Sequence, residues 1–170
     1  MGLFDFFRKK KDVRRMSIFD NELYPYSVAD FDNHRKLFAT LTFEQKCSLV
    51  YPIGCFYKTF MIEGTWQFEE SADLCSQREN LLGISFDEAG EALRNHDGLL
   101  EALMSIEDKQ IIDILLQDMK YLFRILVNMN LVLANGAENN QLAIQSLYSL
   151  FLPLGYDAKQ VCDRREFTMF

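Results

Sequence analysis

Residues 106–134, IEDKQIIDILLQDMKYLFRILVNMNLVLA, carry the longest regular pattern in this chain of 170 residues. Apolar side chains recur there at intervals of three and four, which is the spacing of one face of an α-helix. They are Ile111, Ile112, Leu115, Leu116, Met119, Leu122, Phe123, Leu126 and Val127. At 1.5 Å per residue, a helix over the stretch would reach roughly 40 Å. We therefore predict one long amphipathic helix whose apolar face packs against other helices.

Helix-start signals and few chain breaks mark the rest of the sequence. Capping boxes, in which residues 1 and 4 of a motif satisfy each other's backbone N–H groups, occur at Thr42–Gln45, Ser85–Glu88 and Asp157–Gln160, and Ser27 is placed to cap an earlier helix. Only eight Gly and three Pro interrupt the chain, which favours long helices over many short strands. The length and the 49% hydrophobic content suit one globular core. We predict an all-α, compact helical bundle forming a single domain over residues 17–170.

Turn signals recur with a period of 72 residues. This interval separates Gly64 from Gly136, Gly83 from Gly155, and the capping residue Ser85 from Asp157. The repeat predicts two pseudo-repeated helical hairpin units that bury their apolar faces against each other. In this interpretation Asn135-Gly136 is a structural turn, because both residues tolerate the left-handed conformation.

The same order of turn glycines and helix-capping residues resembles that of the tellurite-resistance TerB-like domains. The resemblance covers about residues 42–165 and rests on Ile62-Glu63-Gly64 with Glu70, on Leu82-Gly83-Ile84-Ser85, on Ala134-Asn135-Gly136 and on Leu154-Gly155-Tyr156-Asp157. It implies an all-α fold of two related hairpins, a role in bacterial stress responses near membrane-bound partners, and no catalytic activity. It also implies metal binding by acidic loop residues. The second loop departs from the family pattern, since Asn135 and Leu142 replace its acidic residues.

The first loop supplies the candidate metal ligands Glu63, Glu69 and Glu70. A hard divalent cation needs several oxygen ligands with net negative charge, and these carboxylates are the nearest match. The alternative is that they are acids at a helix start, where they complement the positive end of the helix dipole. In the same loop, Trp66 and Phe68 either pack on the core or form an exposed patch for a partner.

Motifs for catalysis or cofactor binding are missing from the sequence. His34 and His96 lack a zinc-binding pattern, and we expect both to be solvated, His34 on a polar helix face and His96 in a turn. The cysteines at 47, 55, 75 and 162 form no C-x-x-C pair. We predict reduced, mostly buried thiols in a cytoplasmic protein. Since nucleophile elbows and phosphate-binding loops are also absent, we expect no enzyme and no tightly bound cofactor.

We predict that residues 1–16 form a separate, flexible arm, because the segment is both aromatic and basic. Residues 1–15 carry six Lys/Arg and two Asp, a net charge of +4, whereas the remainder carries −11. The acidic body argues against nucleic acid as a partner. The arm suits an anionic membrane surface, where each basic residue contributes about 1 kcal/mol. Its candidate contact residues are Phe4, Phe6, Phe7, Arg8, Lys9, Lys10, Lys11, Arg14 and Arg15. The alternatives are a solubilising tail, or Phe side chains that dock onto the protein's own core.

Together these patterns predict a non-enzymatic helical interaction module of a bacterial stress-response type, which docks to a membrane surface or a membrane-bound protein partner. One alternative is a divalent-metal-binding domain that uses the first acidic loop. Another is an immunity-type protein that neutralises a partner through its acidic surface. No uncharged stretch of about 18 apolar residues occurs, so we expect a peripheral position at the inner membrane at most.

Overall fold

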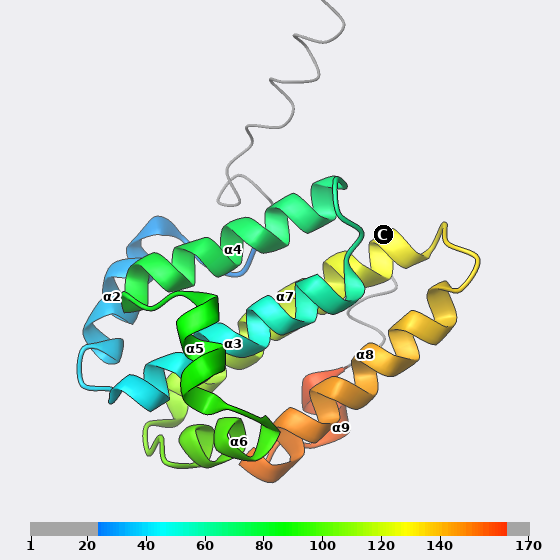
Figure 1. The fold of residues 1–170 in the computed structure, drawn as a ribbon. Coiled ribbons are helices and arrows are strands. Elements are labelled where there is room, and N and C mark those ends of the chain that lie inside the picture. Colours follow the sequence, from blue (N-terminus) through cyan, green and yellow to red (C-terminus); the bar gives the residue numbers. More distant parts are fainter. Residues whose placement is uncertain (1–23, 163–170) are drawn as a thin grey trace, which may run out of the picture.

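The computed structural model describes residues 24–162, and between them it is all-helical, with no strand (Figure 1). The predicted arm and residues 163–170 lie outside this range. The helices are α2 (Val28–Phe38), α3 (Phe43–Phe60), α4 (Trp66–Leu82), α5 (Phe86–Leu93), α6 (His96–Met104), α7 (Lys109–Asn130), α8 (Gly136–Phe151), the 3₁₀ turn η2 (Leu152–Leu154) and α9 (Ala158–Val161). The all-α bundle predicted from the sequence is thus confirmed for the described residues.

Capping residues start these helices where the sequence predicts. The Gln45 backbone N–H donates to Thr42 Oγ1 at 3.2 Å, and the Thr42 N–H donates back to the Gln45 side-chain oxygen at 3.0 Å. The same reciprocal arrangement opens α5 and α9, and a fourth such box opens α2 at Ser27. Each box satisfies N–H groups that a helix start leaves without intrahelical partners.

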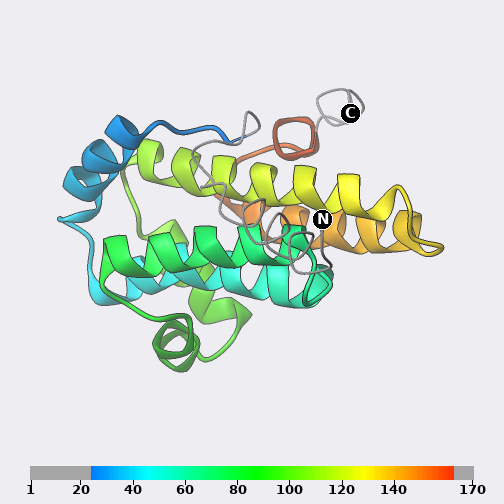
Figure 2. The same ribbon diagram turned by 90° about the horizontal axis from the view of Figure 1, so that it is seen from above.

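Two long helix pairs build the core. Figure 2 shows α3 beside α4 and α7 beside α8, and α3 also packs on α7. The apolar face of α7 is buried, as its spacing predicts, although the helix is shorter than residues 106–134. The short helices α5 and α6 close one end of the bundle next to α3. The most deeply buried aliphatic side chains come from α3, α4, α6, α7, α8 and α9: they are Val50, Ile53, Leu74, Leu103, Leu115, Leu122, Ile125, Leu126, Leu147 and Val161.

The prediction of a left-handed turn at Asn135-Gly136 is wrong. Asn135 has a φ of −106°, and Gly136 is the first residue of α8 and does not have a positive φ. Glycine is required there for space, because a Cβ on Gly136 would lie 2.0 Å from the Asn130 carbonyl oxygen. Its counterpart Gly64 does adopt a left-handed conformation, with a φ of 82°. The two turns therefore reverse the chain by different means.

The chain break near residue 96 also differs from the prediction. His96 does not lie in a turn but is the first residue of α6, which Asn95 caps through a bond from the Gly98 N–H at 2.9 Å. The break falls two residues earlier, at Arg94, where α5 ends with a φ of 64°. The short polar side chain of Asn95 suits a helix start better than a helix interior, which explains the shift.

Candidate functional site

The acidic residues predicted as metal ligands lie in the turn between α3 and α4 and at the start of α4. Glu63 is exposed in the turn between α3 and α4, while Glu69 and Glu70 lie on the first turns of α4. Among residues 24–162, no group of three or more His, Cys, Asp or Glu side chains is arranged to hold a metal ion. Thr65 caps α4 by accepting from the Phe68 N–H at 3.2 Å, so this segment has a structural role at the helix start.

The arm residues predicted to contact a membrane or partner all lie outside the described residues. These are Phe4, Phe6, Phe7, Arg8, Lys9, Lys10, Lys11, Arg14 and Arg15. Within residues 24–162, none of the helices is both long and apolar enough to cross a membrane.

A buried ion pair joins α4 to α7, and sequence reasoning missed it. Arg78 Nε lies 2.7 Å from one carboxylate oxygen of Asp118, and Nη2 lies 2.8 Å from the other. The two side chains are 1% and 2% exposed. Such a two-point contact between a guanidinium and a carboxylate is short, charge-assisted and directional. Both charges are thus buried and are neutralised by each other across the α4–α7 contact.

His34 belongs to the same cluster, so the prediction that it is solvated on a polar face is wrong. Its Nδ1 lies 3.1 Å from Nη1 of Arg78, and the residue is buried. Because a guanidinium can only donate, Nδ1 accepts and the ring proton resides on Nε2. Burial and the positive charge of Arg78 lower the pKa of His34 to about 4. The ring is therefore neutral near pH 7.

Aromatic side chains seal this cluster on the side of α2. The Arg78 guanidinium carbon lies 5.4 Å from the ring centre of Tyr26 and 5.2 Å from that of Phe31. The Tyr26 hydroxyl donates to the Ile114 carbonyl on α7 at 2.9 Å, and burial raises its pKa well above the usual range. These contacts join residues of α2, α4 and α7 and of the segment just before α2 in one buried cluster.

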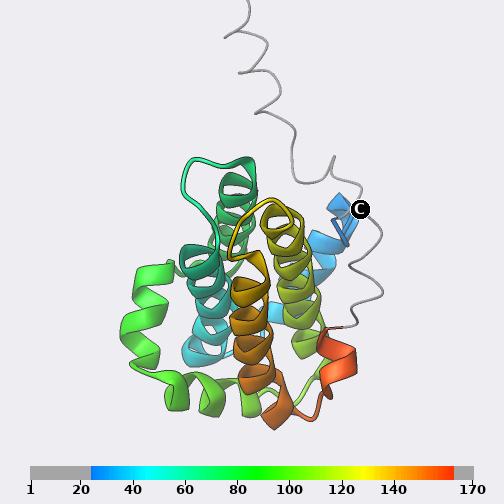
Figure 3. The same ribbon diagram turned by 90° about the vertical axis from the view of Figure 1, so that its right-hand side faces the viewer.

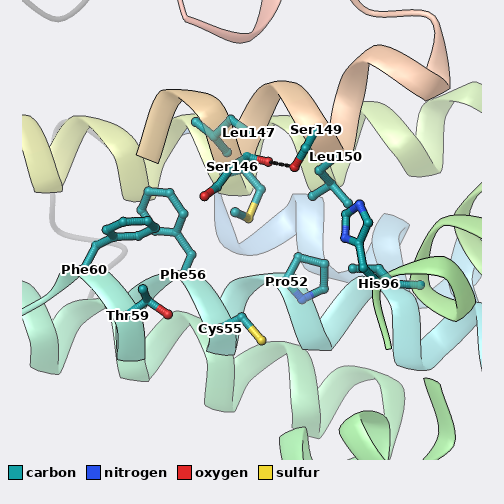
Figure 4. Close-up of a pocket in the computed structure, with 12 residues that line it drawn as sticks. Pro52, Cys55, Phe56, Thr59, Phe60, His96, Ser146, Leu147, Ser149 and Leu150 are labelled. Atoms are coloured by element: carbon teal, nitrogen blue, oxygen red, sulfur yellow. Dashed lines mark hydrogen bonds between the residues drawn. The ribbon is translucent and has the colours of Figure 1, made fainter. Parts of the chain in front are cut away.

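An apolar groove lies between α3 and α8, with α6 at one end (Figure 4). Its volume is about 230 Å³, and it is lined by Pro52, Cys55, Phe56, Thr59, Phe60, His96, Leu99, Met119, Ser146, Leu147, Ser149 and Leu150. Two serine hydroxyls in the α8 wall bond to their own helix. Ser146 donates to the Leu142 carbonyl at 3.0 Å, and Ser149 donates to the Ser146 carbonyl at 2.8 Å. The groove therefore offers a mainly apolar surface.

Four large apolar side chains are exposed at the end of the bundle where α3 turns into α4 and α7 turns into α8. We call them the apolar turns: Ile62 (46% exposed), Trp66 (55%), Leu131 (67%) and Val132 (86%). Figures 1 and 3 show the two turns at the same end of the molecule. Of the two aromatics considered in the first loop, Phe68 packs on the core 5.2 Å from the ring centre of Tyr57, whereas Trp66 is exposed.

The four cysteines, all within the described residues, are free, as predicted. Cys47, Cys75 and Cys162 are buried, and Cys55 is half-buried. Burial raises the pKa of the Cys75 thiol to about 12, and it also raises the pKa values of Cys47 and Cys55. A thiol with a raised pKa is a poor nucleophile at neutral pH, since the thiolate is the reactive form.

Comparisons with protein-family models, curated proteins and solved structures give no match to this chain.

Proposed function

We propose that the protein is a non-enzymatic helical module that binds a partner protein through the apolar turns. The observation that carries this proposal is the exposure of Ile62, Trp66, Leu131 and Val132 at one end of the bundle. Exposed apolar groups that gather in one place mark interaction surfaces, since covering them removes about 25 cal/mol per Å² of unfavourable contact with water. Tryptophan is also among the residues that dominate binding energy at interfaces.

We further propose that the hairpins are arranged as in TerB-like domains and that the protein takes part in a bacterial stress response. Supporting this, Gly83 and Gly155 both have a left-handed conformation, with φ values of 70° and 89°. Each is followed two residues later by the first residue of a complete capping box, Ser85 or Asp157. The left-handed glycine followed by a capping box therefore occurs in both halves of the proposed repeat.

Co-purification from cells that carry the chain natively tests the partner-binding surface. The test variant combines Trp66→Lys with Val132→Lys, which places a charge on each apolar turn. The matched control is Val28→Lys, because Val28 is equally apolar and is 67% exposed on α2. We expect one protein to be retained by the wild type and by the control, but to be lost from the double variant.

The alternative of an immunity-type acidic surface gives a different result in the same experiment. Residues 24–162 contain ten Lys/Arg and 19 Asp/Glu, a net charge of −9. A partner held by these charges would stay bound to the double variant and dissociate as salt is raised, since surface charges are screened within about 8 Å at physiological ionic strength. That outcome, or equal recovery of the same proteins by all three chains, would overturn the proposal.

A further inference from the structure

We propose that the partner of the apolar turns is a basic amphipathic helix of another protein, whose apolar face is flanked by Lys or Arg. This inference rests on the proposed partner-binding role of the apolar turns, and it names the chemistry of what they bind. It is carried by the side-chain charges around the exposed apolar residues. In the two segments that form this end of the bundle, those charges are all acidic.

Carboxylates surround the exposed apolar side chains. Residues 59–72 and 125–145 contain both turns and the adjoining helix ends, and they include four Glu but no Asp, Lys or Arg. Glu69 lies three residues after Trp66, which places the two side chains on the same face of α4. Three of the four acids are exposed: Glu63, Glu69 and Glu138.

The helix dipoles do not compensate this charge. The helices α3 and α7 end at this end of the bundle, whereas α4 and α8 begin there (Figure 3). A helix end carries about half a negative charge and a helix start about half a positive one, so two of each cancel. Lys58, the last cation of α3, lies 4.0 Å over the ring of Phe86, next to α5. The carboxylates therefore make the local potential negative.

Other exposed apolar side chains have cations beside them. Met104, which is 62% exposed, lines one cavity together with Lys109 and Glu107, so charges of both signs adjoin it. Phe43, which is 52% exposed, lies three residues before Lys46 on the same face of α3. An acidic surround without a cation distinguishes the apolar turns from these two sites.

This charge pattern selects among the possible occupants. A second copy of the chain would bring carboxylates against carboxylates, and an anionic membrane would bring lipid phosphates against them, so both contacts are repulsive. A basic amphipathic helix instead lays its apolar stripe on the exposed side chains of the turns. Its Lys or Arg side chains then meet the carboxylates, so that opposite potentials face each other across the interface.

Tryptophan fluorescence of the full chain tests the proposal, because Trp66 is the only tryptophan and is 55% exposed. The probe is a helix-forming peptide of about 18 residues, or five turns, with a leucine face flanked by lysines. The control peptide has the same leucine face flanked by glutamates. We expect a saturable blue shift of the Trp66 emission with the lysine peptide. Neither the glutamate peptide nor anionic phospholipid vesicles should shift it.

Matched charge variants separate the turns from the general acidity of the body. Neutralising the three exposed acids of the turns should weaken binding of the lysine peptide about tenfold, because each exposed ion pair contributes modestly. Neutralising three exposed acids at the α5–α6 end should change it less than about twofold, since distant charges are screened (Figure 1). The test variant combines Glu63→Gln, Glu69→Gln and Glu138→Gln, and the control combines Glu91→Gln, Glu101→Gln and Glu107→Gln.

Three outcomes would overturn the proposal: no emission shift with the lysine peptide, a shift with the glutamate peptide or with vesicles alone, or equal losses in both triple variants. Co-purification of the native partner separates this failure from that of the partner-binding role. A partner that is lost from Trp66→Lys with Val132→Lys, but retained by the glutamine variant of the turns, would contradict a basic partner and leave the role intact. Retention by the lysine double variant would contradict the role itself.

Discussion

Removing one partner of the buried pair between α4 and α7 should destabilise the protein more than any surface change. Asp118→Ala leaves the guanidinium of Arg78 1% exposed and without its carboxylate, while His34 can accept only one of its hydrogen bonds. An uncompensated charge in such a site costs about 3–5 kcal/mol. The free energy of unfolding of a native domain is only about 5–15 kcal/mol, so this single change should remove a large part of the stability.

Urea unfolding, followed by circular dichroism, measures the cost. Arg78→Met with Asp118→Leu removes both charges and should recover most of the loss, since well-packed apolar residues often replace buried pairs at no cost. Arg35→Ala is the surface control. Its pair with Asp32, at 3.3 Å and mostly exposed, should contribute less than about 1 kcal/mol. The reasoning is refuted if Asp118→Ala loses less than the surface control, or if the double variant is no more stable than the single one.

Three further predictions concern pH, glycine and metal ions. The pKa of His34 is about 4 in the folded state and 6.5 in the unfolded state, so the unfolded state takes up its proton first. This residue's contribution to the free energy of unfolding should be constant above about pH 6.5 and fall by about 3 kcal/mol toward pH 4; an identical slope in His34→Leu would contradict this. Gly155→Asn should be nearly neutral in urea unfolding because Asn tolerates a left-handed turn, whereas Gly136→Asn should cost about 2 kcal/mol or more through its clash with the Asn130 carbonyl. Equal costs at the two positions would contradict the different roles assigned to these two glycines. Calorimetric titration with calcium, magnesium or zinc should give no saturable heat at millimolar ion, and a binding curve abolished by Glu63→Gln would support the acidic-loop hypothesis instead.

Local signals in the sequence were sufficient to locate most helices. A capping box acts within four residues, so Thr42, Ser85 and Asp157 mark helix starts whatever packs above them. The signal that ends α4 at Gly83 is equally local, because it depends on the conformation of that one glycine. Gly136 was misassigned because its role depends on contact with the preceding helix, which the sequence does not display.

The buried cluster left a signal that was overlooked. Arg78 stands between Leu74 and Leu82 at intervals of four, and Asp118 occupies the apolar stripe of α7. His34 likewise stands between Phe31 and Phe38 at helical spacing. A charged or polar residue inside an apolar stripe indicates a buried partner of opposite charge. Which stripe supplies that partner is decided by tertiary packing, over a separation of 40 residues here.

The apolar turns and the groove could not be located from sequence alone. Trp66 and Val132 are far apart in the chain, and their common surface exists only because two hairpins reverse at the same end of the bundle (Figure 3). The groove likewise forms from residues of α3, α6 and α8 together with Met119 of α7, which are far apart in the chain. The sequence alone does not show whether an aromatic residue at a helix start packs on the core, as Phe68 does, or is exposed, as Trp66 is.

Hydrogen–deuterium exchange tests the central claim most directly, namely that the apolar turns bind a partner protein. The chain is compared alone and in complex with the protein that co-purifies with it. We predict slower exchange in residues 61–68 and 130–137 of the complex, with no change in α5 and α6. Unchanged exchange in both turns, with protection confined to another surface, would contradict the account.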